Sequence, residues 1–159
     1  MPELTIHITD PAAPEVLKLF EELDGYLVGL YPPESNHILS VEELRQPNVV
    51  FLTAALEGQV VGCGGVVNHG EYAEIKRMFV VPRVRGLRIG RRILDELETI
   101  ARSWGMTIAR LETGVWQPEA LGLYEKTGYQ RRGPFGDYPE HPLCVFMEKS
   151  LGERHQPEV

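Results

Sequence analysis

Hydrophobic positions along the chain follow two periods, one typical of strands and one typical of helices. Alternating or continuous apolar runs predict strands over residues 4–9, 49–56, 60–67, 73–81, 108–112, 129–132 and 143–149. Apolar residues spaced three and four apart predict helices over residues 14–30, 89–103 and 118–126, with a short helix opening after Ser40. Elements in this order predict an α/β domain with a mixed central β-sheet flanked by helices.

Turn and capping residues mark where several of these elements end. Pro32 and Pro33 exclude a helix after residue 30, and the turn at 57–59 joins two strands as a hairpin. Ser40 lies three residues before Glu43, the spacing of a capping box in which each side chain satisfies the other residue's backbone N–H. Gly105 follows the helix at 89–103 and is its expected C-terminal cap.

Composition places the chain among single-domain globular proteins. It has 159 residues and a formal net charge of −7, and we expect one domain over residues 1–151. Residues 152–159 show no apolar period and are predicted to form a disordered tail. The acidic balance disfavours nucleic-acid binding, which needs an extended basic face.

The sequence also argues against a membrane or metal-binding protein. The longest apolar run, at 49–56, is far shorter than a membrane span, and the N-terminus has no signal-peptide pattern. Cys63 and Cys144 have no metal-type spacing, so we expect reduced thiols and no metal site. These features predict a cytoplasmic location. Neither thiol has a neighbouring base in the sequence that would activate it as a nucleophile, so a ping-pong reaction with a covalent intermediate on either cysteine is disfavoured.

The charge anomaly of the chain lies between residues 75 and 94. This stretch holds seven basic residues and no Asp or Glu: Lys76, Arg77, Arg83, Arg85, Arg88, Arg91 and Arg92. Its centre is a glycine-bearing turn at the start of a predicted helix, where free backbone N–H groups and the helix dipole favour an anion. The pattern predicts a phosphorylated cofactor, although surface charges or partners for nearby carboxylates would also account for it. It lacks the residues of a P-loop or a dinucleotide fingerprint.

Two motifs make the chain resemble the GNAT superfamily of N-acetyltransferases over nearly its whole length. The family's pyrophosphate loop, Gln/Arg-x-x-Gly-x-Gly/Ala, corresponds to Arg85-Gly86-Leu87-Arg88-Ile89-Gly90. A downstream signature containing Leu-Tyr-Glu-Lys-x-Gly-Phe/Tyr corresponds to residues 117–129. Arg88 replaces the usual first glycine of the loop, and Gln117 replaces a frequent Asn. Either motif alone would be a weak signal, whereas the two at this spacing are a strong one.

Four shorter motifs resemble a narrower bacterial subgroup whose members are mostly known only as acetyltransferases. These motifs are Pro32-Pro33-Glu34-Ser35-x-His37, Glu74-Ile75-Lys76-Arg77-Met78, Leu111-Glu112-Thr113-Gly114 and Pro134-Phe135-Gly136-x-Tyr138. The subgroup sharpens the expected fold more than the expected substrate.

The resemblance implies that acetyl-CoA is the cosubstrate and that a small amine is acetylated by direct attack. The implied cofactor-binding residues are Met78, Phe79, Val80, Arg85, Gly86, Leu87, Arg88, Ile89, Gly90, Arg91, Gln117 and Tyr124. The strand at 78–80 is expected to diverge from its neighbour and leave an N–H for the thioester oxyanion.

The resemblance implies two catalytic residues, each with a structural alternative. Glu74 lies eleven residues before Arg85, where several members place a general base, but it would equally form an ion pair with a neighbouring cation. Tyr124 corresponds to the residue beside the CoA sulfur and is the expected acid for the leaving thiolate. Its alternative is a half-buried tyrosine that packs on the sheet.

Loops flanking the expected centre would receive the acceptor. Ser35, His37, Arg77 and Tyr138 are the candidate substrate contacts, with local structural roles as the alternative for each. A non-catalytic acyl-CoA-binding module and a peptide acceptor remain competing functions. Leu143–Met147 reads as an apolar edge through which a homodimer would form.

Overall fold

The computed structural model describes residues 3–32 and 40–152. Its elements are β1 (Leu4–Ile8), α1 (Pro14–Leu30), α2 (Val41–Leu44), β2 (Val49–Leu56), β3 (Gln59–Asn68), β4 (Ala73–Val80), the 3₁₀ helix η2 (Pro82–Val84), α3 (Ile89–Ser103), β5 (Ile108–Gly114), α4 (Pro118–Lys126), β6 (Gln130–Arg132) and β7 (Cys144–Ser150). The predicted α/β class is confirmed, with bounds shifted by up to two residues.

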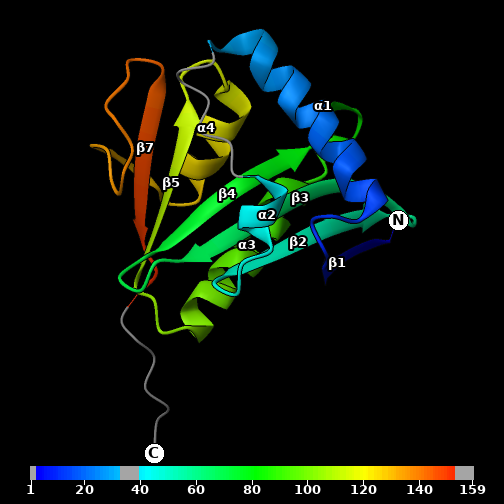
Figure 1. Cartoon of the computed structure of the whole chain (residues 1–159), viewed down its shortest axis with the longest axis horizontal. Coiled ribbons are helices and arrows are strands. Elements are labelled where there is room, and N and C mark those ends of the chain that lie inside the picture. The colour runs from blue at the N-terminus through cyan, green and yellow to red at the C-terminus, as the bar shows by residue number, and fades with distance from the viewer. Residues whose placement is uncertain (1–2, 33–39, 153–159) are drawn as a thin grey trace, which may run out of the picture.

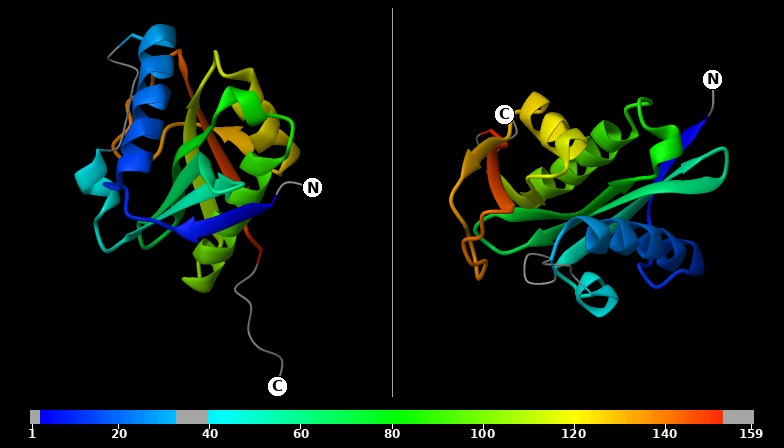
Figure 2. Two further views of the ribbon diagram at one scale, coloured as in Figure 1. Left: turned by 90° about the vertical axis from the view of Figure 1, so that its right-hand side faces the viewer. Right: turned by 90° about the horizontal axis from the view of Figure 1, so that it is seen from above.

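The seven strands form one mixed sheet in the order β1-β2-β3-β4-β5-β7-β6. Only β4 and β5 are parallel; the other neighbours are antiparallel. Helices α3 and α4 cover one face of the sheet, while α1 and α2 lie on the other (Figure 2). In Figure 1, β4 and β5 lie together at one end and diverge toward the other.

Helical periodicity accounts for the packing of the two longest helices. Helix α1 buries Val16, Leu19, Phe20 and Leu23, and α3 buries Ile89, Ile93, Leu94, Leu97 and Ala101. The buried Val, Leu, Ile and Phe side chains supply about 1.5–3 kcal/mol each, so these two stripes anchor both layers to the sheet. The predicted capping box is present, because Ser40 Oγ accepts from Glu43 N and Glu43 Oε1 accepts from Ser40 N.

The predicted dimer edge is wrong in its placement. Strand β7 is an internal strand that pairs with β5 along its whole length and with β6 over 146–148. Val145, Phe146 and Met147 are buried in the monomer. The hydrogen-bonding edges of the sheet are therefore β1 and β6, and homodimer formation stays an untested prediction.

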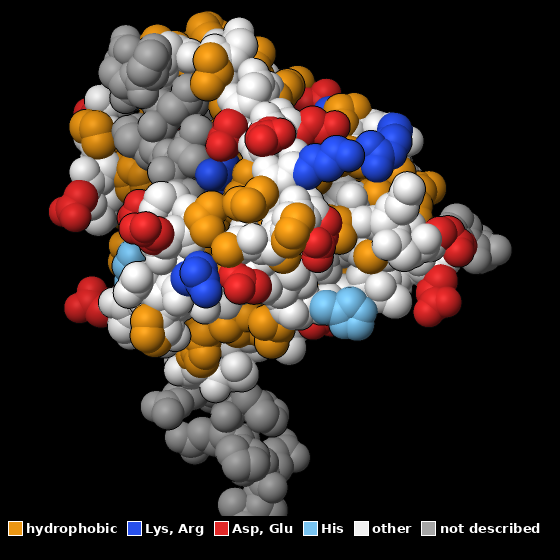
Figure 3. All heavy atoms as spheres, turned by 45° about the vertical axis from the view of Figure 1, so that its right-hand side comes forward, with side chains coloured by type: hydrophobic (Ala, Val, Ile, Leu, Met, Phe, Trp, Pro, Cys, Tyr) orange, Lys and Arg blue, Asp and Glu red, His pale blue; other side chains and the backbone are white. Residues whose placement is uncertain are grey.

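Three further findings describe the outside of the molecule. The face in Figure 3 mixes acidic, basic and hydrophobic side chains. Within the described part of the chain, no helix is long and apolar enough to cross a membrane. Residues 3–32 and 40–152 also hold no group of three His, Cys, Asp or Glu arranged to bind a metal ion. The predicted tail lies outside the described residues from position 153 onward.

Candidate active site

The centre of the site is the point where β4 and β5 separate. Their parallel register covers only residues 73–75 and 109–111, so residues 76–80 have no partner in β5. The register of β4 against β3 also shifts, because Lys76 faces Gly65 while Phe79 faces Cys63. Two residues, Arg77 and Met78, thus oppose one, which is a β-bulge, and Arg77 has a positive φ of 56°. The divergence expected of this strand is confirmed.

The basic turn follows β4 directly and ends at the first turn of α3. Gly86 has φ 94°, and Arg88 has φ 60° and ψ 25°, so both adopt the left-handed region. The start of α3 has no side-chain cap, which leaves its first amides directed at the turn. Arg85 Nε donates to the Val80 carbonyl at 3.2 Å and Arg91 lies 3.7 Å from Asp95, so two of the five arginines over residues 83–92 are partly engaged within the protein.

Tyr124 is buried on α4, close to the separation of β4 and β5. Burial, together with the negative charge of Glu112, raises the pKa of its phenol. Its ring meets that of Tyr129 edge to face at 5.7 Å, and within residues 3–32 and 40–152 its hydroxyl finds no hydrogen-bond partner. Gln117 is the N-cap residue of α4 and makes no side-chain cap bond.

Glu74 is the centre of a hydrogen-bonded group on the α1 side of the sheet. Tyr138 Oη donates to Glu74 Oε2 at 2.5 Å, and His69 Nε2 lies 2.9 Å from Glu74 Oε1. Lys76 Nζ donates to Tyr138 Oη and lies 3.6 Å from the same carboxylate. Glu74 is only 5% exposed. The ion-pair alternative for Glu74 is therefore present in the structure, and the sequence-predicted Tyr138 lies in contact with it.

Glu112, on β5, is a residue to which sequence reasoning assigned no role. Burial raises the pKa of its carboxyl to about 7, against the lowering effects of Lys76 and of a hydrogen bond with Cys144. The sequence likewise indicates no role for His69, which is stacked on Tyr72 at 4.8 Å. Strand alternation is the sequence signal that could have identified Glu112, because it places residues 110, 112 and 114 on one face of the sheet.

The other sequence-predicted contacts are distributed differently. Arg77 points toward α1, where it pairs with Asp24 and lies 4.4 Å above the ring of Phe20. Arg77 is therefore held in an ion pair within the protein, which is the structural role that the sequence offered as the alternative to substrate contact. Ser35 and His37 lie outside the described residues. Burial raises the pKa of both cysteine thiols to about 12, which makes them poor nucleophiles at neutral pH.

Tyr31 is the C-cap residue of α1 and lies beside Gly114, at the end of β5. Its hydroxyl accepts from Trp116 N at 2.9 Å, and the two rings stack at 5.3 Å.

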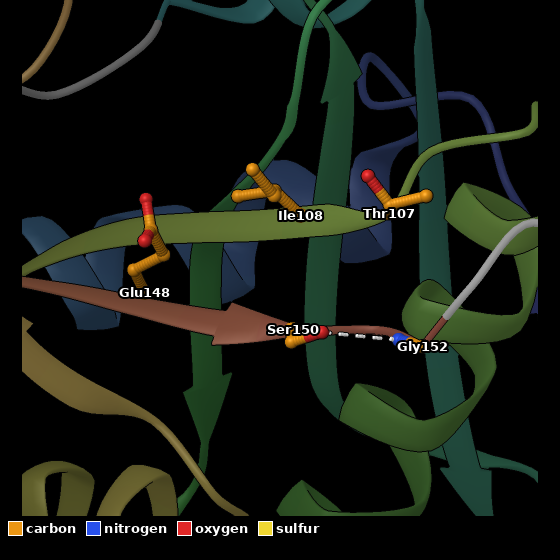
Figure 4. Close-up of a pocket in the computed structure, with 5 residues that line it drawn as sticks. All are labelled: Thr107, Ile108, Glu148, Ser150 and Gly152. Atoms are coloured by element: carbon orange, nitrogen blue, oxygen red, sulfur yellow. Dashed lines mark hydrogen bonds between the residues drawn. The ribbon is translucent and has the colours of Figure 1, made fainter.

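An open depression lined by Thr107, Ile108, Glu148, Ser150 and Gly152 lies at the other end of β5 and β7 (Figure 4). It is remote from the divergence of β4 and β5 and shares no residue with the site.

A diverging parallel pair, a bulged strand and a basic turn at a helix start define an acyltransferase-type α/β fold. The model of the acetyltransferase (GNAT) family matches residues 16–129. An IAA acetyltransferase of Azospirillum brasilense is 49% identical over 153 residues, which cover 95% of this chain and all of that protein. The chain belongs to the GNAT family and is an acetyltransferase.

Solved structures agree with this membership. A Klebsiella pneumoniae protein provisionally named an acyl-CoA N-acyltransferase has a TM-score of 0.79 and 34% identity, covering 94% of this chain and 98% of its own. The PaiA N-acetyltransferase of Thermoplasma acidophilum, solved with coenzyme A, has a TM-score of 0.72 at 20% identity, covering 93% of this chain and 99% of its own. The second likeness supports the fold alone. Membership of an enzyme family favours catalysis over the binding-only alternative.

Proposed function

We propose that this acetyltransferase moves an acetyl group from acetyl-CoA to the primary amine of a small molecule by direct attack. The single observation that carries the proposal is the bulged, unpaired stretch of β4 ending in the basic turn of α3. A thioester lying along this stretch would meet unpaired backbone N–H groups, and its phosphates would meet the amides and guanidinium groups of the turn. We also propose that the protein acts in the cytoplasm.

The residues at the turn and on α4 suit the two ends of the cosubstrate. Arg85, Gly86, Leu87, Arg88, Ile89, Gly90 and Arg91 would hold the pyrophosphate, and Met78, Phe79, Val80, Gln117 and Tyr124 would line the pantetheine arm. The positive φ at Gly86 and Arg88 curves the turn around the start of α3. The residues present therefore fit a polyanionic thioester.

Tyr124 would protonate the departing thiolate. Its raised pKa keeps the phenol neutral over the working pH range, which a proton donor requires. The acceptor would approach from the α1 face, where Glu74, Lys76 and Tyr138 are clustered. A small acceptor suits this cluster better than a peptide, because the Tyr138 ring of the cluster packs against Phe135 of the 133–143 loop and Phe146 of β7.

The test is thiol release with a matched pair of tyrosine variants. Acetyl-CoA should raise the melting temperature, and a panel of primary amines and amino acids should release free CoA thiol with at least one member. Tyr124→Phe should lower kcat at least tenfold with little change in acetyl-CoA affinity. Tyr129→Phe is the control, since Tyr129 Oη donates to Glu98 on α3, outside the site.

Absence of a thermal shift at saturating acetyl-CoA would remove the cosubstrate assignment. Binding without thiol release across the panel would instead favour the binding-only alternative, and acetylation of test peptides alone would favour a peptide acceptor.

A further inference from the structure

Glu112 is the first residue of β5 beyond its pairing with β4. The last paired residues are Ile75 and Leu111, so Glu112 and Lys76 face each other across the start of the divergence. Glu74 is in register with Arg110, and residues two apart on a strand share a face. The Glu112 side chain therefore lies on the same face of the sheet as the Glu74 cluster.

The surroundings of Glu112 link the two halves of the site. Six titratable groups act on its carboxyl or feel its charge: Glu74 and Lys76 from β4, Cys144 from β7, Tyr124 from α4, Tyr31 from the end of α1 and Tyr138 from the 133–143 loop. Tyr124 is the proposed proton donor to sulfur, whereas Tyr138 and Lys76 belong to the acceptor side. The Glu112 carboxylate thus stands between the expected positions of the thioester and of the amine.

Glu74 is committed to a different task. One of its oxygens accepts from Tyr138, the other contacts His69, and Lys76 lies nearby. At 5% exposure it is held within the protein by these contacts. Such a carboxylate fixes the Tyr138 hydroxyl and the Lys76 ammonium in place, and accepting a proton would disrupt both.

We propose that Glu112 takes the proton from the acceptor amine and that Glu74 is a positioning residue for Tyr138. The proposal rests on the proposed acetyl transfer to an amine. A general base works best when its pKa lies near the operating pH, and the burial of Glu112 raises its pKa to about 7. An ordinary carboxyl would be too weak a base for this task.

The proton balance of the reaction is as follows. Glu112 accepts one proton from the ammonium and releases it to solvent. The neutral amine then forms the N–C bond to the thioester carbonyl, and the C–S bond breaks. The sulfur takes the phenolic proton of Tyr124, which is restored by the second proton that leaves nitrogen. One proton is released for each acetyl group transferred, and one remains on the CoA thiol.

The test compares three isosteric variants: Glu112→Gln, Glu74→Gln and the control Glu96→Gln on the exposed face of α3. The probe is the amine that gives the fastest thiol release in the panel, and kcat/KM is measured from pH 5.5 to 9.5. We expect an acidic limb with a midpoint near 7 in the wild type and in Glu96→Gln. Glu112→Gln should lose this limb and about 10²–10⁴-fold in kcat.

Glu74→Gln should keep the acidic limb and raise KM for the amine more than it lowers kcat. A limb that persists in Glu112→Gln and disappears in Glu74→Gln would overturn the assignment and make Glu74 the base. Unaltered kinetics in Glu112→Gln would also overturn it. If the wild type itself binds acetyl-CoA but releases no thiol with any amine, the proposed function fails, and this inference fails with it.

A second readout is independent of turnover. In protein labelled with ¹³C at glutamate side-chain carboxyls, the resonance that disappears in Glu112→Gln should titrate near pH 7 without any ligand. A midpoint below 5 for that resonance would contradict the proposed role.

Discussion

Arg88 holds a backbone conformation that favours glycine, so Arg88→Gly should stabilise the protein. Its φ of 60° and ψ of 25° lie in the left-handed region, at the N-cap of α3. This conformation costs an L-residue about 1–2 kcal/mol. The greater freedom of glycine in the unfolded chain offsets about 0.5–1 kcal/mol of that gain. The Arg88 side chain is exposed and makes no cap bond, so its removal sacrifices no packing.

The net expectation is a gain of about 0.5–1 kcal/mol in the free energy of unfolding. For a chain of 159 residues this corresponds to a rise of about 1–4 °C in the melting temperature without ligand. Differential scanning calorimetry would measure the rise. Arg88→Ala is the matched control, since it removes the same charge but keeps a Cβ in the strained conformation. Equal melting temperatures for the two variants would refute the strain argument.

The same pair of variants separates strain from phosphate binding. If the Arg88 guanidinium contacts a phosphate of acetyl-CoA, both variants lose the same exposed charge contact, about 0.5–1 kcal/mol. Calorimetric titration should then give a Kd about two- to fivefold higher in each. Unchanged affinity for acetyl-CoA in both variants would mean that the Arg88 guanidinium does not contact a phosphate. The argument from the left-handed backbone of Arg88 would not be affected.

Three other predictions concern stability. Gly114→Ala would place a Cβ in steric overlap with Tyr31 Oη, so urea titration should show a loss of about 1–3 kcal/mol in the free energy of unfolding. A loss under about 0.5 kcal/mol would mean that Tyr31 shifts to relieve the overlap. Glu98→Gln removes the carboxylate that accepts from Lys149 Nζ at 2.8 Å and should cost about 2–3 kcal/mol, measured against wild type by the same titration. Glu112 has a raised pKa, so its contribution to stability is full below the unfolded pKa of about 4.3 and is lost as pH rises through about 7. Glu112→Gln should therefore gain stability relative to wild type between pH 4 and 8, and a difference that does not change with pH would contradict the assigned pKa.

Local pattern predicted the elements well because each long element carries its own period. The stripe of α3 and the capping box before α2 are complete within a few residues, so no tertiary knowledge was needed. The spatial order of the last two strands, by contrast, does not follow from any local pattern. Strand β7 enters between β5 and β6, and the 133–143 loop that allows this has no signal for which edge the chain will join.

The sequence predicts which residues form the candidate site, and this prediction stays untested; it does not predict the contacts that these residues make with one another. The basic turn and Tyr124 follow from a motif, whereas the partners of Glu74 come from a hairpin tip and a distant loop. His69 and Tyr138 meet that carboxylate only because of strand register and loop closure, which no single segment encodes. Glu112 could have been found by asking which side chains alternate onto the face of Glu74.

Lys76 and Arg77 show how the bulge in β4 resolves a conflict within the sequence. Two successive cations in a buried strand should point to opposite faces, which would send one guanidinium into the α3 side of the core. The extra residue at the bulge reverses the alternation, so Arg77 turns toward Asp24 while Met78 packs near Gly64. The pairing of β4 with β5 ends at the residue before Lys76. The two consecutive cations therefore mark, in the sequence, the place where β4 bulges and separates from β5, and catalysis is proposed to depend on this separation.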